Sequence, residues 1–426
     1  MNRAQLVEPI LQSSSLRTPS LFYRSDLVRA LALAALLVMS GCDSPGQHKK
    51  KHPTAAKSEP ASKAKNPHTD PQPEADPLAV SRAYVNALPD TYPKIVPTKA
   101  TGTTHVVSSF LFEGKPIRVD LDANNGTLEG ARTAQRDVTY PVGERPSDLE
   151  ARANVPYVVD AAQDSFFEAI LIQFRAIRAE QKLDDDRYYE LLTAFVQNIP
   201  YDTHGKAGGR FPLEVVVDNT GDCDEKSRLL AGLAAREGYA VALLTFDTEQ
   251  HMAVGIKANE LTFKETGYAY TEATLVSPVT NPFADTDTLE IKSNPLIIPI
   301  GSGQKRYGAT ADIRYLVDTR ASLTQMVDEE NRKIAKANSD MAALNADADR
   351  LARKLNARGS SRATDTDSLK KQFDKITEQQ RTLDVESRQV LARATTHVSL
   401  ANLYNDPFIA RVPLVQRLRD GLAALP

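Results

Sequence analysis

The residues of this chain best suited to covalent chemistry are a cysteine, a histidine and a glutamate. Cys223 lies in "GDCDEKS", and of the two cysteines in the sequence it is the only one beyond Cys42. Thiols in oxidising compartments tend to be paired, so an isolated one calls for a reason. A thiolate is a nucleophile, an imidazole can take up its proton, and a carboxylate can orient the imidazole. His251 and Glu272 are the candidates for those two supporting roles.

The elements predicted around these residues would bring them together. Residues 222–237 have a helix-forming composition with Gly238 as the stop, which puts Cys223 at a helix start, where backbone N–H groups and the helix dipole favour a thiolate. Three β-like runs follow, at residues 239–246, 251–257 and 268–274. His251 begins the second run, and Glu272 on the third can reach it if the two strands pair antiparallel.

The neighbours of the thiol are polar, which argues against a buried cysteine acting as a small hydrophobe. They are Asp222, Asp224, Glu225 and Lys226. The adjacent acids would raise the pKa of the thiol, so a cationic partner is needed to favour the thiolate, and an imidazolium is the usual one. A chance free thiol at the surface is the alternative without function.

Metal binding is another use for the same three residue types. Only three dispersed ligands are present, without the C-x-x-C or H-x-x-x-H spacing of zinc sites. We therefore predict no metal site and no cofactor.

Four blocks of the sequence resemble the bacterial transglutaminase-like cysteine peptidase group. They are "FVQNIPYD" (195–202), "FPLEVVVDNTGDCDEKSRLLAGLAAREGYAVALL" (211–244), "HMAVGI" (251–256) and "YTEAT" (270–274). The resemblance covers about residues 104–280 and implies a papain-like α+β fold with the nucleophile at a helix N-terminus. It matches Cys223 to the nucleophile, His251 to the base and Glu272 to the third member of the triad, where the commonest transglutaminases have aspartate.

Two further residues concern the surroundings of this triad. The backbone N–H of Cys223 is one candidate donor for an oxyanion hole, and Gln197 is a candidate second donor. A structural amide in the "VQNIPY" turn is the competing interpretation of Gln197. Glu214 resembles the family's glutamate before the catalytic helix, and we expect it to make a structural contact.

The N-terminal residues predict an exported lipoprotein. Arg24 and Arg29 precede an apolar run, residues 30–39, that is too short for a good membrane span and is followed by small residues. The sequence "MSGC" resembles a bacterial lipoprotein signal, which implies lipidation of Cys42. Asp43 resembles an inner-membrane retention signal, so the expected place is the periplasmic side of the bacterial cell envelope, with the inner membrane favoured and the outer membrane left open.

The remaining patterns divide the chain into six parts. We predict a signal peptide at 1–42, a disordered tether at 43–78, a small β-containing region at 79–150, a transglutaminase-like domain at 151–316, a coiled-coil helical hairpin at 317–398 and a helical tail at 399–426. Apolar residues at alternating three- and four-residue steps, interrupted by Glu330, predict the coiled coil. "RGSS" at 358–361 favours an antiparallel hairpin, and a parallel dimer is the competing arrangement.

These features lead to two functional hypotheses. The formal net charge of −3 gives no support to nucleic-acid binding. The first hypothesis is an envelope-anchored thiol hydrolase or acyltransferase that acts on peptide or amide bonds of a peptide or protein substrate through a thioester. The second is a catalytically inactive binding or scaffold lipoprotein, which acts through its coiled coil on a protein partner or a second copy.

Overall fold

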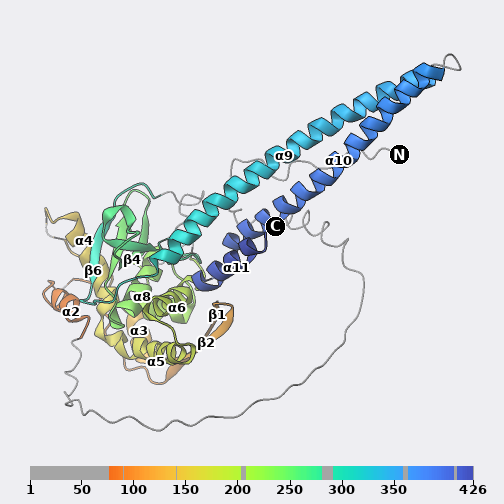
Figure 1. Cartoon of the computed structure of the whole chain (residues 1–426). Coiled ribbons are helices and arrows are strands. Elements are labelled where there is room, and N and C mark those ends of the chain that lie inside the picture. Colours follow the sequence, from red (N-terminus) through yellow and green to blue (C-terminus); the bar gives the residue numbers. More distant parts are fainter. Residues whose placement is uncertain are drawn as a thin grey trace, which may run out of the picture. The chain divides into compact units, whose positions relative to one another are not determined.

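The computed structural model describes residues 76–89, 91–140, 142–202, 208–280, 291–357, 363–406 and 410–425. The predicted signal peptide, the lipidation site Cys42, Asp43 and nearly all of the tether lie outside the described residues. Within them the fold is mixed helix and sheet, with two antiparallel sheets and a helical C-terminal region (Figure 1). This agrees with the predicted α+β class.

The larger sheet carries the predicted histidine and glutamate strands. Its strands are β3 (Val241–Phe246), β4 (His251–Lys257), β5 (Tyr268–Thr271) and β6 (Leu296–Ile300), in the spatial order β5-β4-β3-β6 and antiparallel throughout. Every residue of β3 is buried, as its unbroken run "VALLTF" suggests for a central strand covered on both faces. The smaller sheet is a hairpin of β1 (Thr103–Phe112) and β2 (Lys115–Asn124), within the β-containing region predicted at 79–150.

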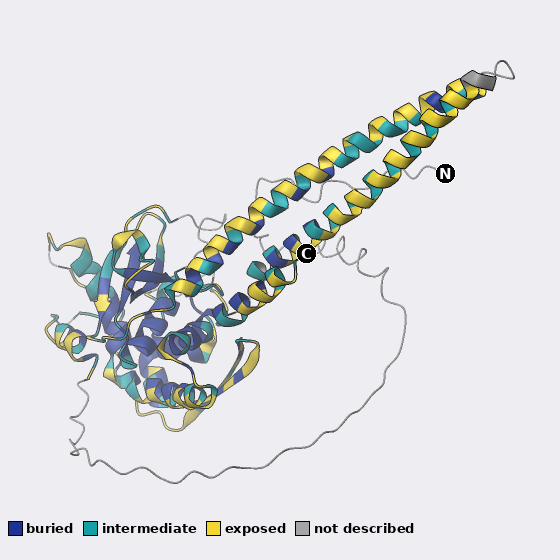
Figure 2. Cartoon of the chain, viewed as in Figure 1, coloured by how far each residue is buried: buried dark blue, intermediate teal, exposed yellow. Residues whose placement is uncertain are grey.

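Helices pack around the two sheets or on one another. They are α2 (Ala79–Asn86), α3 (Asn125–Thr133), α4 (Pro146–Val159), α5 (Asp164–Gln181), α6 (Asp185–Gln197), α7 (Pro212–Asp218) and α8 (Cys223–Arg236), with short 3₁₀ turns at Ala161–Gln163, Phe263–Glu265 and Leu403–Asn405. Helix α8 packs against β3 and β4 and is buried at every position from Glu225 to Ala235. Figure 2 shows this buried centre of the fold in dark blue.

The predicted boundary at residue 150 does not separate two cores. Phe110 of β1 packs against Phe174 of α5 and Phe195 of α6, with ring centroids 6.4 and 5.8 Å apart. These residues belong to one hydrophobic cluster that also includes α8 and β4. The hairpin β1–β2 therefore packs on the same core that positions the candidate catalytic strands.

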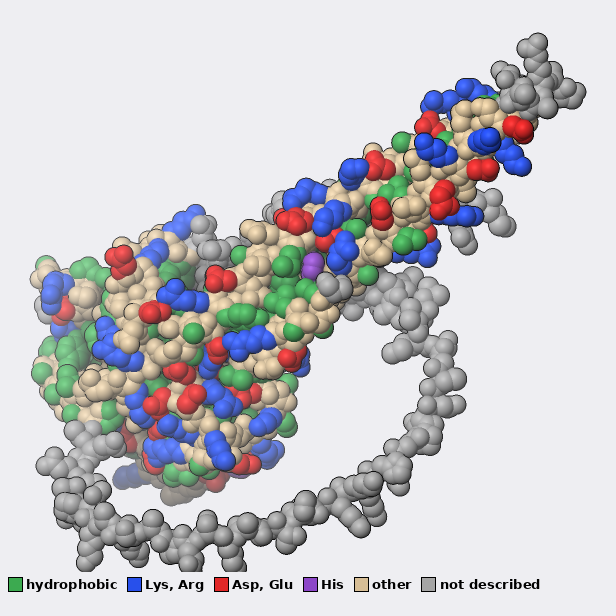
Figure 3. Space-filling view, viewed as in Figure 1, with side chains coloured by type: hydrophobic (Ala, Val, Ile, Leu, Met, Phe, Trp, Pro, Cys, Tyr) green, Lys and Arg blue, Asp and Glu red, His purple; other side chains and the backbone are tan. Residues whose placement is uncertain are grey.

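The predicted coiled-coil hairpin consists of α9 (Thr310–Ala357) and α10 (Ala363–Asn402), which lie side by side (Figure 1). Two cross-helix contacts define the antiparallel register: Gln380 donates to Asn345 at 2.8 Å, and Arg393 contacts Glu330 at 3.3 Å. Glu330, the residue that interrupts the apolar repeat, is therefore a buried anion with a partner on each helix, since Lys333 also pairs with it at 2.9 Å. Figure 3 shows the acidic and basic side chains interspersed along both helices.

Helix α11 (Arg411–Ala423) lies in the segment predicted as a helical tail and packs on the protein's own core. Its residues Leu414, Val415 and Leu418 are buried, and it contacts α9. Arg411 at its first position donates through Nε to the carboxylate of Glu190 in α6 at 2.7 Å. No helix within the described residues is long and apolar enough to span a membrane.

Candidate active site

Cys223 is the first residue of α8, as the sequence predicts. Asp222 caps the helix: its carboxylate accepts from the backbone N–H of Glu225 at 3.0 Å, and Glu225 accepts from the N–H of Asp222 at 3.1 Å. This capping box uses two of the backbone donors at the helix start. The N–H of Cys223 lies in the same first turn. Backbone N–H groups of the first turn have no acceptor within their own helix, so they can stabilise a developing anion.

His251 and Glu272 meet across the pair β4–β5, where Val254 is the partner of Thr271. His251 begins β4, and Glu272 directly follows the last residue of β5. The two side chains are 8% and 5% exposed, and His251 Nε2 lies 3.1 Å from Glu272 Oε2. Contact through Nε2 leaves Nδ1 as the nitrogen available to a thiol.

Glu272 is held as a carboxylate by several donors. Burial raises its pKa, but hydrogen bonds from His251, Thr274 and Tyr270 outweigh burial and lower that pKa to about 2. Both the N–H and the hydroxyl of Thr274 donate to Oε1, at 2.8 and 2.6 Å. A carboxylate that stays charged at neutral pH can orient the imidazole and stabilise it when it takes up a proton.

Tyr270 is a member of this group that the sequence analysis did not assign to it. Its hydroxyl donates to Glu272 Oε2 at 2.6 Å and lies 3.1 Å from His251 Nε2. Its place two residues before Glu272, on the same strand face, was the available sequence signal. Phe246, the β-sheet partner of His251, packs on the imidazole with ring centroids 6.3 Å apart, so the ring lies between a polar pair and an apolar wall.

The surroundings of Cys223 favour the protonated thiol over the thiolate. Burial and then the neighbouring carboxylate of Asp224 raise the pKa of Cys223, which is about 12. Sγ donates to Asp224 Oδ1 at 3.4 Å, and this contact holds the proton on sulfur. The adjacent acids therefore have the effect that the sequence predicts, and the structure contains no preformed thiolate.

Two contacts bring the thiol close to the histidine strand. The backbone of Met252, the residue after His251, hydrogen-bonds to Cys223 and lowers its pKa. Ser227, one turn further along α8, donates to the carbonyl of Met252 at 3.1 Å. Among the described residues no direct hydrogen bond joins Cys223 to His251, so proton transfer between them requires the thiol to turn from Asp224.

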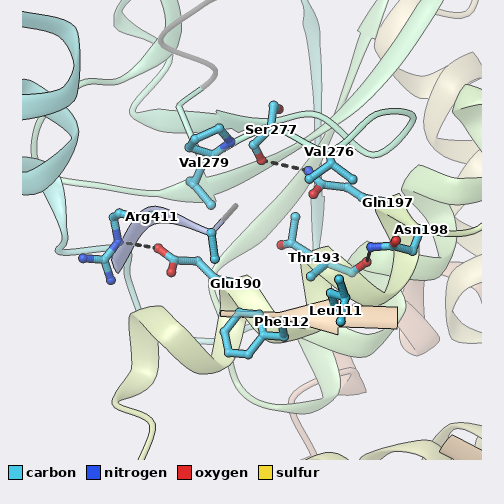
Figure 4. Close-up of a pocket in the computed structure, with 13 residues that line it drawn as sticks. Leu111, Phe112, Glu190, Thr193, Gln197, Asn198, Val276, Ser277, Val279 and Arg411 are labelled. Atoms are coloured by element: carbon cyan, nitrogen blue, oxygen red, sulfur yellow. Dashed lines mark hydrogen bonds and ion pairs between the residues drawn. The ribbon is translucent and has the colours of Figure 1, made fainter. Parts of the chain in front are cut away.

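Gln197 lies beside this group, and its side chain points towards Ser277 (Figure 4). Its side-chain N–H₂ donates to the carbonyls of Glu272 at 2.8 Å and Ser277 at 3.0 Å. Both amide protons are thus engaged with backbone oxygens, which is the geometry of the structural amide that is the competing interpretation of Gln197. The cavity drawn there has about 40 Å³ of free space, enough for about three water molecules and too little for a peptide.

Glu214 makes the structural contact predicted for it. Its buried carboxylate pairs with Arg136 at 2.8 Å and accepts from the backbone N–H of Phe211 at 2.9 Å. Glu225 and Lys226, two of the polar neighbours of the thiol in the sequence, are both fully buried.

Comparisons of this chain with protein-family models, curated proteins and solved structures give no match. Within the described residues there is also no group of three or more His, Cys, Asp or Glu side chains arranged to hold a metal ion.

Proposed function

We propose that the chain is a thiol hydrolase or acyltransferase of the transglutaminase-like cysteine peptidase type, acting on peptide or amide bonds. The observation that carries this proposal is the buried pair of His251 Nε2 and the Glu272 carboxylate at 3.1 Å, next to a helix that starts with Cys223. A charged carboxylate behind an imidazole and a thiol at a helix N-terminus are the parts that acyl transfer needs.

The chemistry follows from these positions. His251 Nδ1 takes the proton from Sγ as the thiolate attacks the amide carbonyl, and the developing oxyanion lies near the first backbone N–H groups of α8. The same proton passes from the imidazolium to the leaving amine, which leaves a thioester on Cys223. Water or a second amine then attacks the thioester, and its proton returns through His251 to the released thiol.

The raised pKa of Cys223 decides how the thiol is activated. Because the thiol is protonated at neutral pH, the mechanism uses His251 as a general base during attack and does not start from a standing thiolate–imidazolium pair. The same observation favours a second candidate function, a scaffold lipoprotein whose thiol stays inert and whose hairpin α9–α10 carries the activity.

Alkylation kinetics separate the two candidates. Purified full-length chain, His251→Ala and Glu272→Gln are treated with iodoacetamide from pH 5 to 9, and the Cys223 peptide is quantified by mass. We expect the wild-type thiol to react at least about tenfold faster at pH 7 than in either variant. Cys42, the other cysteine, serves as the reference thiol in chain purified before lipidation. Equally slow alkylation of Cys223 in all three proteins would support the scaffold.

The proposed place of action is the periplasmic side of a bacterial membrane, with Cys42 as the lipidated residue. Support comes from the sequence around Cys42 alone, since it lies outside the described residues. Expression with radiolabelled palmitate tests it: label is expected in the wild-type chain and absent in Cys42→Ser, and label in both would reject this anchor. Fractionation of inner and outer membranes then tests the preference drawn from Asp43.

A further inference from the structure

Lys226 is a buried cation beside the site that the mechanism above does not use. It lies one turn after Cys223 in α8 and has no exposed surface. Its Nζ donates to three backbone carbonyls, those of Ile199 at 2.6 Å, Gln197 at 3.3 Å and Thr274 at 3.3 Å. All three ammonium protons therefore have acceptors, as a buried charge requires.

These carbonyls belong to two chain segments that contact Glu272. Thr274 donates to the carboxylate of Glu272 through both its N–H and its hydroxyl. Gln197, at the end of α6, donates its side-chain amide to the carbonyl of Glu272. Lys226 thus holds the backbone of the residues that hold Glu272 from either side.

The stem of Lys226 also shapes the turn that precedes Cys223. Gly221 packs on it so closely that an added Cβ would lie 3.2 Å from Lys226 Cγ. The N–H of Gly221 donates to the carbonyl of Pro200 at 3.2 Å, and its carbonyl accepts from Asp202 at 3.0 Å. Both the turn before Cys223 and the segment after β5 therefore contact the side chain of Lys226.

The charge of Lys226 is matched to Glu272. Burial lowers the pKa of Lys226, and the Glu272 carboxylate offsets part of this effect. The resulting pKa is about 8, so the ammonium form is present at neutral pH. The ammonium group is closed off from solvent, and its hydrogen bonds go to backbone carbonyls of the two segments that contact Glu272. It therefore acts on the reaction through Glu272 and does not touch a substrate.

We propose that Lys226 is the positioning residue of the site: its ammonium group fixes Glu272, and through it His251, relative to the helix that carries Cys223. This inference rests on the proposed function, because it gives Lys226 a role in that site. It predicts that loss of the charge disturbs the imidazole even in a protein that remains folded.

The test compares two cations of the same helix, of which Lys226 is fully buried and the side chain of Arg236 is 10% exposed. Lys226→Met and Lys226→Arg are compared with Arg236→Met, since Arg236 also lies in α8 but at its far end, where it donates to the carbonyls of Val158 and Gly232 at 3.1 Å and pairs with Asp164 at 2.9 Å. Two properties are measured in the full chain: the His251-dependent alkylation of Cys223 across pH, and the ¹⁵N–¹H signal of His251 Nε2, identified by its loss in His251→Ala. Melting temperatures report the stability of each variant.

We expect Lys226→Met to lose at least about tenfold in His251-dependent alkylation at pH 7 and to shift or lose the Nε2 signal. Lys226→Arg should regain part of both, and Arg236→Met should keep both even if its melting temperature falls as far. A folded Lys226→Met with wild-type values would overturn the inference, as would equal losses in Arg236→Met. If Lys226→Met does not fold, Lys226→Gln takes its place.

The two proposals fail separately. If wild-type alkylation does not depend on His251, the proposed function is wrong, and the Nε2 signal alone then judges Lys226: a change in Lys226→Met supports the positioning role and an unchanged signal rejects it. If alkylation depends on His251 in the wild type and equally in Lys226→Met, only the inference on Lys226 is wrong.

Discussion

At Cys223 the helix start and the neighbouring side chains act on the thiol in opposite directions. The N-terminus of α8 favours the thiolate, whereas burial and the Asp224 carboxylate raise the pKa of Cys223 to about 12. The outcome is a thiol that reacts only when a base takes its proton. The reaction of this thiol with an alkylating agent therefore depends on His251 in the same way as the proposed reaction with a substrate.

Neutralising that carboxylate should make the thiol more reactive. Asp224→Asn removes the anion that accepts from Sγ at 3.4 Å, so we expect the pKa of Cys223 to fall and alkylation at pH 8 to rise about tenfold. Asp222→Asn should give a smaller rise, because Asp222 contributes less to the shift and Asn remains a good N-cap. Asp218→Asn, whose native carboxylate pairs with Arg132 at 2.7 Å, is the control without effect. An unchanged rate in Asp224→Asn would contradict this account of the raised pKa.

Lys226 should leave a signature in the pH dependence of stability. Its pKa is about 8 in the folded protein and near 10.5 when exposed, so between these values the unfolded chain binds more protons and the free energy of unfolding rises with pH. The gain is on the order of 3 kcal/mol at most. Urea unfolding of wild type and Lys226→Met from pH 7.5 to 10 measures it. The difference between the two curves should change with pH, and parallel curves would reject the lowered pKa.

Among the elements, α8 depends on close packing against α5. Gly232 lies where an added Cβ would come 2.7 Å from the ring of Phe167, and Arg236 lies over the same ring at 3.7 Å. Glycine within a helix is ordinarily improved by alanine. Here we expect Gly232→Ala to destabilise the protein by about 1–3 kcal/mol, because the ring must move.

The control for Gly232→Ala is Gly308→Ala, where the nearest atom, a carboxylate oxygen of Asp186, would be at an ordinary 3.4 Å. Urea unfolding of both variants should show a lower midpoint for Gly232→Ala alone. A stabilised Gly232→Ala would mean that α5 and α8 are not in tight contact.

Helices and strands whose apolar residues follow a clear pattern were predictable from the sequence, and those without such a pattern were not. The bounds of β4 agree with the run predicted at 251–257, because a short buried apolar run defines this strand. Helix α4 was not predicted, since it contains Pro156 and is buried on several sides, so its apolar residues form no stripe. Strand β6 was not predicted either, because its run Leu296–Ile300 contains a proline and lies far along the chain from its partner β3.

The candidate site follows the same division. Cys223, His251 and Glu272 were predictable because their types are rare in this combination and the strand order brings two of them together. Lys226 was not, because a lysine next to three acids suggests a solvated helix face. Its spacing from Leu229, Leu230 and Leu233 on the same helix was the overlooked signal, since it shares their buried side.

At the scale of the whole molecule, a buried charge pair joins helix α11 to the core that carries the candidate site. Glu190 of α6 accepts from Arg411 at 2.7 Å and from Tyr307 at 2.6 Å, and Arg411 also pairs with Asp312 of α9. The same helix α6 ends at Gln197, which contacts Glu272. Helix α6 is therefore linked to the start of α9, to α11 and to the candidate site.

Removing the positive charge of Arg411 should lower the free energy of unfolding. In Arg411→Met, Glu190 stays buried without its charged partner, and we expect a loss of about 3–5 kcal/mol in the free energy of unfolding. Glu190→Gln combined with Arg411→Met should recover part of it. Arg419→Met serves as the matched control in α11, because its pair with Asp312 spans 3.6 Å and the side chain is 55% exposed. Urea midpoints measure all three, and equal values for the two single variants would show that the pair contributes nothing.

The pair of Glu190 and Arg411 also bears on the order of events during synthesis. The ribosome makes Glu190 long before Arg411, and the long helices α9 and α10 are translated between them. Until α11 has been translated, the core that supports the site holds a carboxylate without its charged partner, so this part of the core is completed only after α9 and α10 have been made. A nucleophile that completes its surroundings only then would remain inactive on the nascent chain.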